Sequence, residues 1–122
     1  KRFLIIKWFG HETPLKYCRI LHESLLEQLV YAVLILDLKF SGSRSLKQKR
    51  SMIKPILSRL HKEFNISVAE IGKNDRWDES VIACGLISNE GNSASAQLNA
   101  VRDYFESYMR EVSIVNYSIT LM

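Results

Sequence analysis

Basic side chains are concentrated in residues 44–62. This stretch has no acidic residue and contains Arg44, Lys47, Lys49, Arg50, Lys54, Arg59 and Lys62. If the stretch is helical, the side chains of residues 47, 50, 54 and 61 lie along one flank, because their spacing follows the helical repeat. Such a strip could follow a phosphate backbone, with salt-dependent binding. A solvated, Lys-rich helix face is the simpler alternative, and the sequence leaves both interpretations open.

The residues just before this predicted helix add a second feature that attracts anions. Ser45 is suited to be the helix N-cap, and Gln48 follows it at the spacing of a capping box. The first N–H groups and the positive end of the helix dipole would then lie beside Ser43 and Arg44. The sequence therefore predicts a nucleic-acid-binding or anion-binding surface made of Ser43, Arg44, Ser45, Lys47, Arg50, Lys54 and His61.

Trp77 stands in a polar segment between Arg76 and Asp78. An exposed tryptophan in such a place could stack on a nucleic-acid base. A loop tryptophan more often folds back over an edge of the core, because its large ring is stabilised by burial, and we favour that interpretation.

No pattern in the sequence amounts to a catalytic or cofactor-binding signature. His11, Cys18 and His22 are potential metal ligands, but a closed zinc site needs four ligands and no fourth is obvious. P-loop, nucleophile-elbow, CxxC and dinucleotide-binding patterns do not occur. We therefore predict no catalytic residues, no bound metal and no cofactor.

The apolar periodicity predicts the elements that position these side chains. Strand patterns cover residues 31–40, 66–71, 81–88 and 112–122, and helical spacing follows residue 45 and residue 93. Pro55 lies inside the first helix, where we expect a kink and not a break, because the apolar stripe continues past it. This order predicts an α+β, ferredoxin-like βαββαβ fold, with a four-stranded antiparallel sheet and two helices on one face.

Two apolar stripes and one open face follow from this assignment. The core stripe of the first helix is expected to be Leu46, Ile53, Leu57, Leu60 and Phe64, and that of the last strand Val115, Tyr117, Ile119 and Leu121. On the first strand, Tyr31, Val33 and Ile35 should face away from the helices. That open face is a candidate surface for self-association or for contact with the N-terminal part of the chain.

The chain divides near residue 30. Residues 1–29 are predicted to be an N-terminal extension with a short apolar segment and an amphipathic helix, too small to fold alone. Residues 30–122 are predicted to be the folded domain. The whole chain has 122 residues, a net charge of +4 and 47% apolar residues, as expected for a packed globular protein. Two cysteines and no apolar stretch of about 20 residues favour a reduced, cytoplasmic protein without a membrane anchor.

Three segments resemble a known family. Residues 42–50, G-S-R-S-L-K-Q-K-R, are similar to its G-A-R-S-L-K-E-K-R, and residues 64–71, F-N-I-S-V-A-E-I, to its F-N-V-S-V-A-E-V. A third segment fits at Asp75, Trp77, Ser88 and Asn89. Over residues 30–122 the chain thus resembles the YlxP-like family, small bacterial proteins of unknown function. Gln48 in place of Glu, Pro55 and residues 1–29 depart from the family pattern.

The resemblance implies a ferredoxin-like fold and, because family genes often lie beside translation-initiation and ribosome-maturation genes, a connection with RNA or the ribosome. Together with the basic helix, it predicts a non-enzymatic RNA-binding or ribosome-associated accessory protein. Two alternatives stay open. One is an acylphosphatase-like enzyme that holds an anion in residues 41–45, although no suitably placed Asn is seen for the attacking water. The other is a dimeric structural adaptor, a homodimer through the open sheet face.

Overall fold

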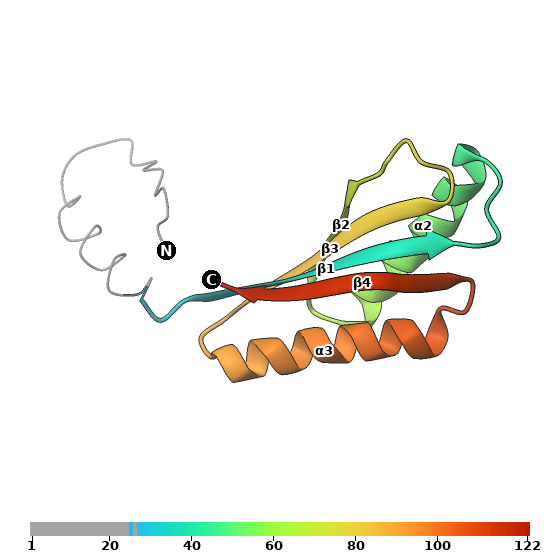
Figure 1. Ribbon diagram of the computed structural model, residues 1–122. Coiled ribbons are helices and arrows are strands. Elements are labelled where there is room, and N and C mark those ends of the chain that lie inside the picture. Colours follow the sequence, from blue (N-terminus) through green and yellow to red (C-terminus); the bar gives the residue numbers. More distant parts are fainter. Residues whose placement is uncertain (1–24, 26) are drawn as a thin grey trace, which may run out of the picture.

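The computed structural model describes residue 25 and residues 27–122, which form a sheet layer and a helix layer (Figure 1). In chain order the elements are β1 (Val30–Phe40), α2 (Leu46–Glu63), β2 (Ser67–Gly72), β3 (Glu79–Ser88), α3 (Gly91–Tyr108) and β4 (Val112–Leu121). The strands lie in the order β2-β3-β1-β4, and all neighbours are antiparallel. The predicted ferredoxin-like βαββαβ fold is confirmed.

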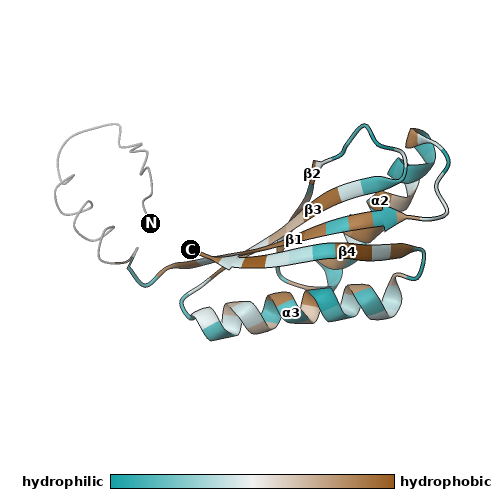
Figure 2. Cartoon of the chain, viewed as in Figure 1, coloured by the Kyte–Doolittle hydropathy of each residue, from teal (hydrophilic) through white to brown (hydrophobic). Residues whose placement is uncertain are grey.

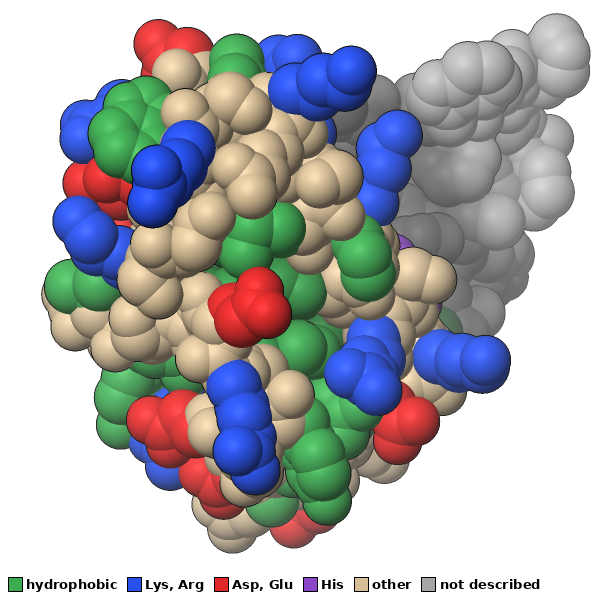
Figure 3. All heavy atoms as spheres, turned by 90° about the vertical axis from the view of Figure 1, so that its right-hand side faces the viewer, with side chains coloured by type: hydrophobic (Ala, Val, Ile, Leu, Met, Phe, Trp, Pro, Cys, Tyr) green, Lys and Arg blue, Asp and Glu red, His purple; other side chains and the backbone are tan. Residues whose placement is uncertain are grey.

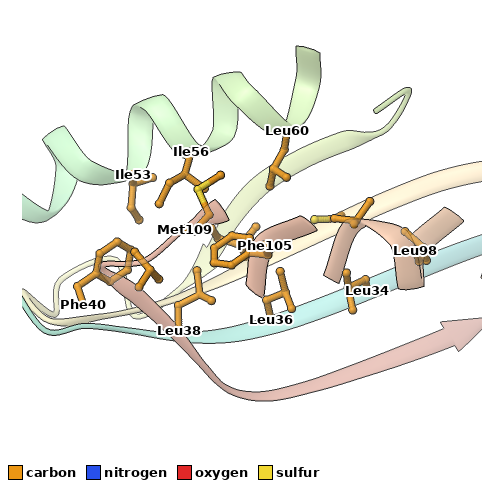
Figure 4. Packing of buried hydrophobic residues seen from close by; sticks show 14 of the residues in the cluster. Leu34, Leu36, Leu38, Phe40, Ile53, Ile56, Leu60, Leu98, Phe105 and Met109 are labelled. Atoms are coloured by element: carbon orange, nitrogen blue, oxygen red, sulfur yellow. The ribbon is translucent and has the colours of Figure 1, made fainter. Parts of the chain in front are cut away.

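Strict alternation along β1 builds the core. Ala32, Leu34, Leu36, Leu38 and Phe40 are at most 1% exposed, because every second side chain of a strand points to the same face. In Figure 4, Leu34, Leu36, Leu38 and Phe40 point toward the helix layer, where they meet apolar side chains of α2 and α3. The intervening residues of β1 lie on the other face, as predicted. In Figure 2 the helices are mostly hydrophilic or intermediate in colour, with fewer hydrophobic positions, as expected for elements that bury one face.

The core stripe of α2 differs from the predicted one. The helix runs without a break through Pro55, as predicted, but its buried residues are Lys49, Ile53, Ile56 and Leu60. Leu46, Leu57 and Phe64 are only partly buried. The helix is therefore rotated about its axis relative to the prediction, so that a lysine takes a core position.

A bulge changes the predicted stripe of β4. Asn116 pairs with Asp37 and Ile114 pairs with Leu38, so Val115 is an extra residue between two register positions. Because one extra residue reverses the alternation, the core-facing residues are Val112 and Ile114 before the bulge, and residues 117, 119 and 121 after it. Val115 therefore does not belong to the predicted stripe.

Cys84 lies in the centre of the sheet, opposite Leu34 of β1 and Val68 of β2. Burial raises the pKa of its thiol from 9.0 to about 12. The unfolded chain therefore loses this proton at lower pH than the folded protein does. The stabilising effect is present below pH 9 and is lost as the pH rises toward 12.

We expect the free energy of unfolding to fall between pH 9 and 12 more steeply in the wild type than in Cys84→Ala. The difference in slope should approach about 1.4 kcal/mol per pH unit. Urea titrations of both proteins at several pH values measure it, and other groups that titrate in this range cancel in the comparison. Equal slopes would show that the thiol is accessible in the folded state.

Candidate nucleic-acid interface

The loop between β1 and α2 (residues 41–45) and the turn between β2 and β3 (residues 73–78) meet at one end of the molecule. The Ser43 hydroxyl donates to the backbone carbonyl of Trp77 at 2.5 Å. The backbone N–H of Phe40 donates to the carbonyl of Asp78 at 2.8 Å. The fold thus brings together two segments that the sequence only singled out separately.

Ser43 is a buried residue that links the loop to the turn through a hydrogen bond, and it is not part of the surface. The residue is 2% exposed, and its hydroxyl lies near two acceptors, Trp77 O at 2.5 Å and Ser45 O at 3.1 Å. A hydroxyl has one proton to donate, and the shorter contact indicates that Trp77 receives it. The hydroxyl is therefore not offered to an anion, and we remove Ser43 from the predicted binding residues.

The predicted N-cap Ser45 is present at the start of α2, in a variant of the capping box in which the Gln48 side chain reaches back to Arg44 and not to the N-cap N–H. Ser45 Oγ accepts a hydrogen bond from the Gln48 N–H at 3.1 Å, and Gln48 Oε1 accepts one from the Arg44 N–H at 2.8 Å. These bonds engage two N–H groups that an anion could have used. Attraction for an anion at this end of the helix consequently depends more on basic side chains than on backbone donors.

Lys49 is a structural residue that the sequence interpretation missed. Its side chain is completely buried, and its ammonium group lies 2.8 Å from Lys73 O, 3.0 Å from Glu79 O and 3.1 Å from Glu70 Oε2. The ammonium group donates its three hydrogen bonds to the carbonyls of Lys73, Glu79 and, at 3.5 Å, Asn74, and its contact with Glu70 is an ion pair. Glu70 Oε2 also accepts from the Ser80 hydroxyl at 2.7 Å. The charge is thereby paired and hydrogen-bonded, as burial requires.

The position of Lys49 had a signal in the sequence. It precedes Ile53 by four residues and Ile56 by seven, which puts it on the same helical stripe. However, Lys49 also lies within a run of basic residues, and this suggested an exposed position instead of a buried one.

The turn that Lys49 holds has an unusual backbone. Lys73 has φ 54, which is uncommon for a residue with a side chain. The side chain of Lys73 donates to Glu79 at 2.8 Å and to Asp37 at 3.3 Å. The hydrogen bond to Glu79 contributes most to raising the pKa of Lys73, and the bond to Asp37 raises it further. The bond from Lys73 in turn lowers the pKa of Glu79.

Other basic residues near the turn are also paired. Arg76 lies 3.1 Å from Glu79 and 3.8 Å from Asp78, and Lys39 lies 3.6 Å from Asp78. With Lys73, these cations have carboxylate partners within the protein. They contribute little unbalanced positive charge to this end of the molecule.

Unlike the cations near the turn, the basic side chains of the predicted strip on α2 have no carboxylate partners among residues 27–122. Lys47, Arg50, Lys54 and His61 are all exposed, and so is Arg44 just before the helix. Within residues 27–122, none of these five side chains forms an ion pair. Figure 3 looks onto the end of the molecule where the loop and turn lie, and shows Lys and Arg side chains around much of its outline, with Asp and Glu grouped between some of them. The strip is thus a basic surface without carboxylate partners in the described part of the chain, and we call it the α2 flank.

Arg59 and Lys62 belong to the other side of α2. They line a groove of about 490 Å³ together with Pro55, Ile56 and Met109. The basic run in the sequence is therefore divided by the helix into the α2 flank, this groove and the buried Lys49.

Trp77 is 49% exposed. We expected it to fold back over a core edge, but the turn covers it only in part, because the turn is held through backbone carbonyls and not through the ring. The Trp77 backbone lies near the start of α2, since Ser43 is bonded to the Trp77 carbonyl.

Other predicted features have simple outcomes. Among residue 25 and residues 27–122, no three His, Cys, Asp or Glu side chains gather closely enough to hold a metal ion. His11, Cys18 and His22 lie outside the described residues, as does nearly all of the predicted extension, residues 1–29. In the described part of the chain, no helix is long and apolar enough to cross a membrane.

The open sheet face carries a shallow hollow of about 450 Å³. Tyr31 and Val33 of β1 and Gly85 and Ile87 of β3 contribute to its lining. The placement of Tyr31, Val33 and Ile35 opposite the core-facing leucines agrees with the prediction.

These features define a small α+β protein of ferredoxin-like order with a basic flank on α2 that has no carboxylate partners among residues 27–122. The chain belongs to the family described as "Protein of unknown function (DUF503)", whose profile matches residues 31–119. It is also similar to "Uncharacterized protein YlxP" of Bacillus subtilis (strain 168), with 33% identity over 64 residues, which are 52% of this chain and 70% of that protein. The resemblance to the YlxP-like family is thereby confirmed.

We expect Lys49→Met to lower the free energy of unfolding by about 3 kcal/mol or more, because it leaves Glu70 and three backbone carbonyls without their cation. Lys47→Met is the matched control in the same turn of the helix. It should change the free energy of unfolding by no more than about 0.5 kcal/mol, since Lys47 is exposed. Urea unfolding measures both. A loss under about 1 kcal/mol for Lys49→Met would contradict the assigned role.

Proposed function

We propose that this chain is a non-enzymatic RNA-binding or ribosome-associated accessory protein, and that the α2 flank is its binding surface. The observation that carries the proposal is the row of exposed basic side chains on this flank that have no carboxylate partners among residues 27–122. A helix rises 1.5 Å per residue, so the row from Lys47 to His61 spans about 21 Å. That length is sufficient to contact several phosphates of one strand.

The physical basis is the difference between paired and unpaired cations. Lys39, Lys73 and Arg76 already have carboxylate partners, so a phosphate would have to compete for them. The cations of the α2 flank can approach a phosphate without such competition. Each contact would release counterions from the nucleic acid and stabilise the complex at low salt.

The geometry favours this proposal over an anion-binding enzyme. A phosphate cradle in residues 41–45 would need loop N–H and hydroxyl donors that are free to turn toward the ligand. The Arg44 N–H and the Ser43 hydroxyl donate instead to Gln48 and Trp77. The family resemblance adds support through the neighbouring translation and ribosome-maturation genes that it implies.

The surface is tested with Lys47→Ala/Arg50→Ala/Lys54→Ala and a labelled RNA hairpin with single-stranded flanks. We expect weaker binding and a salt dependence whose slope of log K against log salt is smaller by about 2–3, since three phosphate contacts are lost. Fluorescence anisotropy at several salt concentrations measures the slope.

The control for this experiment is Arg59→Ala/Lys62→Ala/Arg110→Ala. This variant also removes three positive charges, but from exposed residues that lie outside the α2 flank. We expect its slope to change by less than about 1. Equal effects of the two triple variants would show that net charge, and not the flank, determines binding, and unchanged binding by the first variant would eliminate the surface.

Trp77 is proposed to stack on an unpaired base next to the α2 flank. Trp77→Ala should then weaken binding to the same RNA by about 1–3 kcal/mol, whereas Trp77→Phe should retain most of the affinity because it keeps an aromatic face. The loss should be nearly independent of salt, unlike that of the charge variants. If both substitutions bind as tightly as the wild type, Trp77 does not contact RNA.

A further inference from the structure

The outer edge of β4 lacks most of the usual protection of an edge strand. β4 is the last strand in the sheet order, and its ten residues, VSIVNYSITL, include no charged residue and no proline. Exposed edges in proteins are commonly protected by lysines, prolines or bulges, because their unpaired backbone groups can bind another strand. Here the bulge at Val115 is the only such device within β4.

The hydrogen-bond pattern identifies the backbone groups that point outward. Tyr31 and Met122 exchange both backbone hydrogen bonds, at 3.1 and 2.8 Å. In an antiparallel pair, bonded positions alternate with non-bonded ones, so the β4 residues opposite Ala32, Leu34 and Leu36 direct their N–H and C=O groups away from β1. By register, these residues are Leu121, Ile119 and Tyr117.

One contact supports this direction independently. The Tyr117 N–H donates to the side-chain oxygen of the adjacent Asn116 at 2.9 Å, which is possible because this N–H is not engaged with β1. In the sheet of the described residues, no strand lies beyond β4. The outward groups of Ile119 and Leu121 therefore face the surroundings of the sheet.

We propose that β4 pairs with β4 of a second copy of this chain, antiparallel and around a two-fold axis at Ile119. In this register Ile119 faces Ile119 of the second copy, and Tyr117 faces its Leu121. All three outward-pointing residues of each strand are then bonded, with about six hydrogen bonds across the interface. The Tyr117 N–H would exchange Asn116 for a carbonyl of the second copy.

A second copy fits this edge for two reasons. Two-fold symmetry makes the same uncharged strand complementary to itself, so every bonded residue on one side has its equivalent on the other. In addition, Tyr117 and Leu121 are each 45% exposed and lie on the same side of the sheet. They would cover one another across the axis, and Arg102 already packs over the Tyr117 ring at 4.6 Å.

The other surfaces of the sheet fit a second copy less well. The open face carries the charged side chains of Asp37 and Lys73 at one end, and these would have to be desolvated in a face-to-face dimer. The opposite edge, β2, is only six residues long and has its own irregularity near Gly72.

The test uses the full chain, free of nucleic acid, in sedimentation equilibrium over a range of concentrations. Ser118 and Thr120 are exposed, point to the open face and lie opposite one another across the proposed axis. Ser118→Lys/Thr120→Lys places like charges opposite one another twice and should raise the dimer dissociation constant about tenfold or more. Ser118→Lys/Thr120→Glu places opposite charges there and should retain the dimer.

Urea unfolding at low protein concentration verifies that both variants keep a folded monomer. If the wild type stays monomeric at every concentration, the proposal is overturned. This holds even if the β4 edge binds a different protein. Equal effects of the two double variants overturn it as well, because the proposed register places like charges opposite one another in the first variant and opposite charges in the second. None of these outcomes depends on whether the α2 flank binds RNA.

Discussion

The ammonium group of Lys49 has three protons; inside the protein it donates hydrogen bonds to three backbone carbonyls of the β2–β3 segment and forms an ion pair with Glu70. A buried charge is tolerated only with such complete pairing. This constraint fixes the rotation of α2 about its axis, because Lys49 must face the core. It also fixes the turn, including the left-handed Lys73, against the start of the helix. The position of Trp77 and the direction of the α2 flank both follow from it.

This arrangement separates the cations into groups that a net charge of +4 cannot distinguish. Lys49 is buried and bonded inside the protein. Lys39, Lys73 and Arg76 form ion pairs with carboxylates near the turn. Arg59 and Lys62 line a groove. Of the other basic residues in the described part of the chain, Arg102 pairs with Asp103 and Arg110 is exposed elsewhere, whereas Arg44, Lys47, Arg50 and Lys54 follow one flank of α2. A basic surface thus arises in a weakly basic protein because several other cations are paired with carboxylates, while these four share one flank without such partners among residues 27–122.

The sequence was sufficient for the fold and for the α2 flank, because both depend on local periodicity. The alternation in β1 and the spacing of Lys47, Arg50 and Lys54 are properties of single elements. The misassigned features depend on contacts between elements. The burial of Lys49 needs a carboxylate from β2, the role of Ser43 needs a carbonyl from a turn more than thirty residues away, and the bulge at Val115 needs the register with β1.

The most direct test of the central constraint is the hydrogen exchange of the lysine ammonium groups, measured by 15N-edited NMR on the labelled protein. An ammonium group whose three protons are bonded inside the protein should exchange slowly enough to give a resolved signal, which disappears in Lys49→Met and persists in Lys47→Met. If no such signal exists, or if it survives Lys49→Met, then Lys49 is not the buried cation that holds the turn against α2.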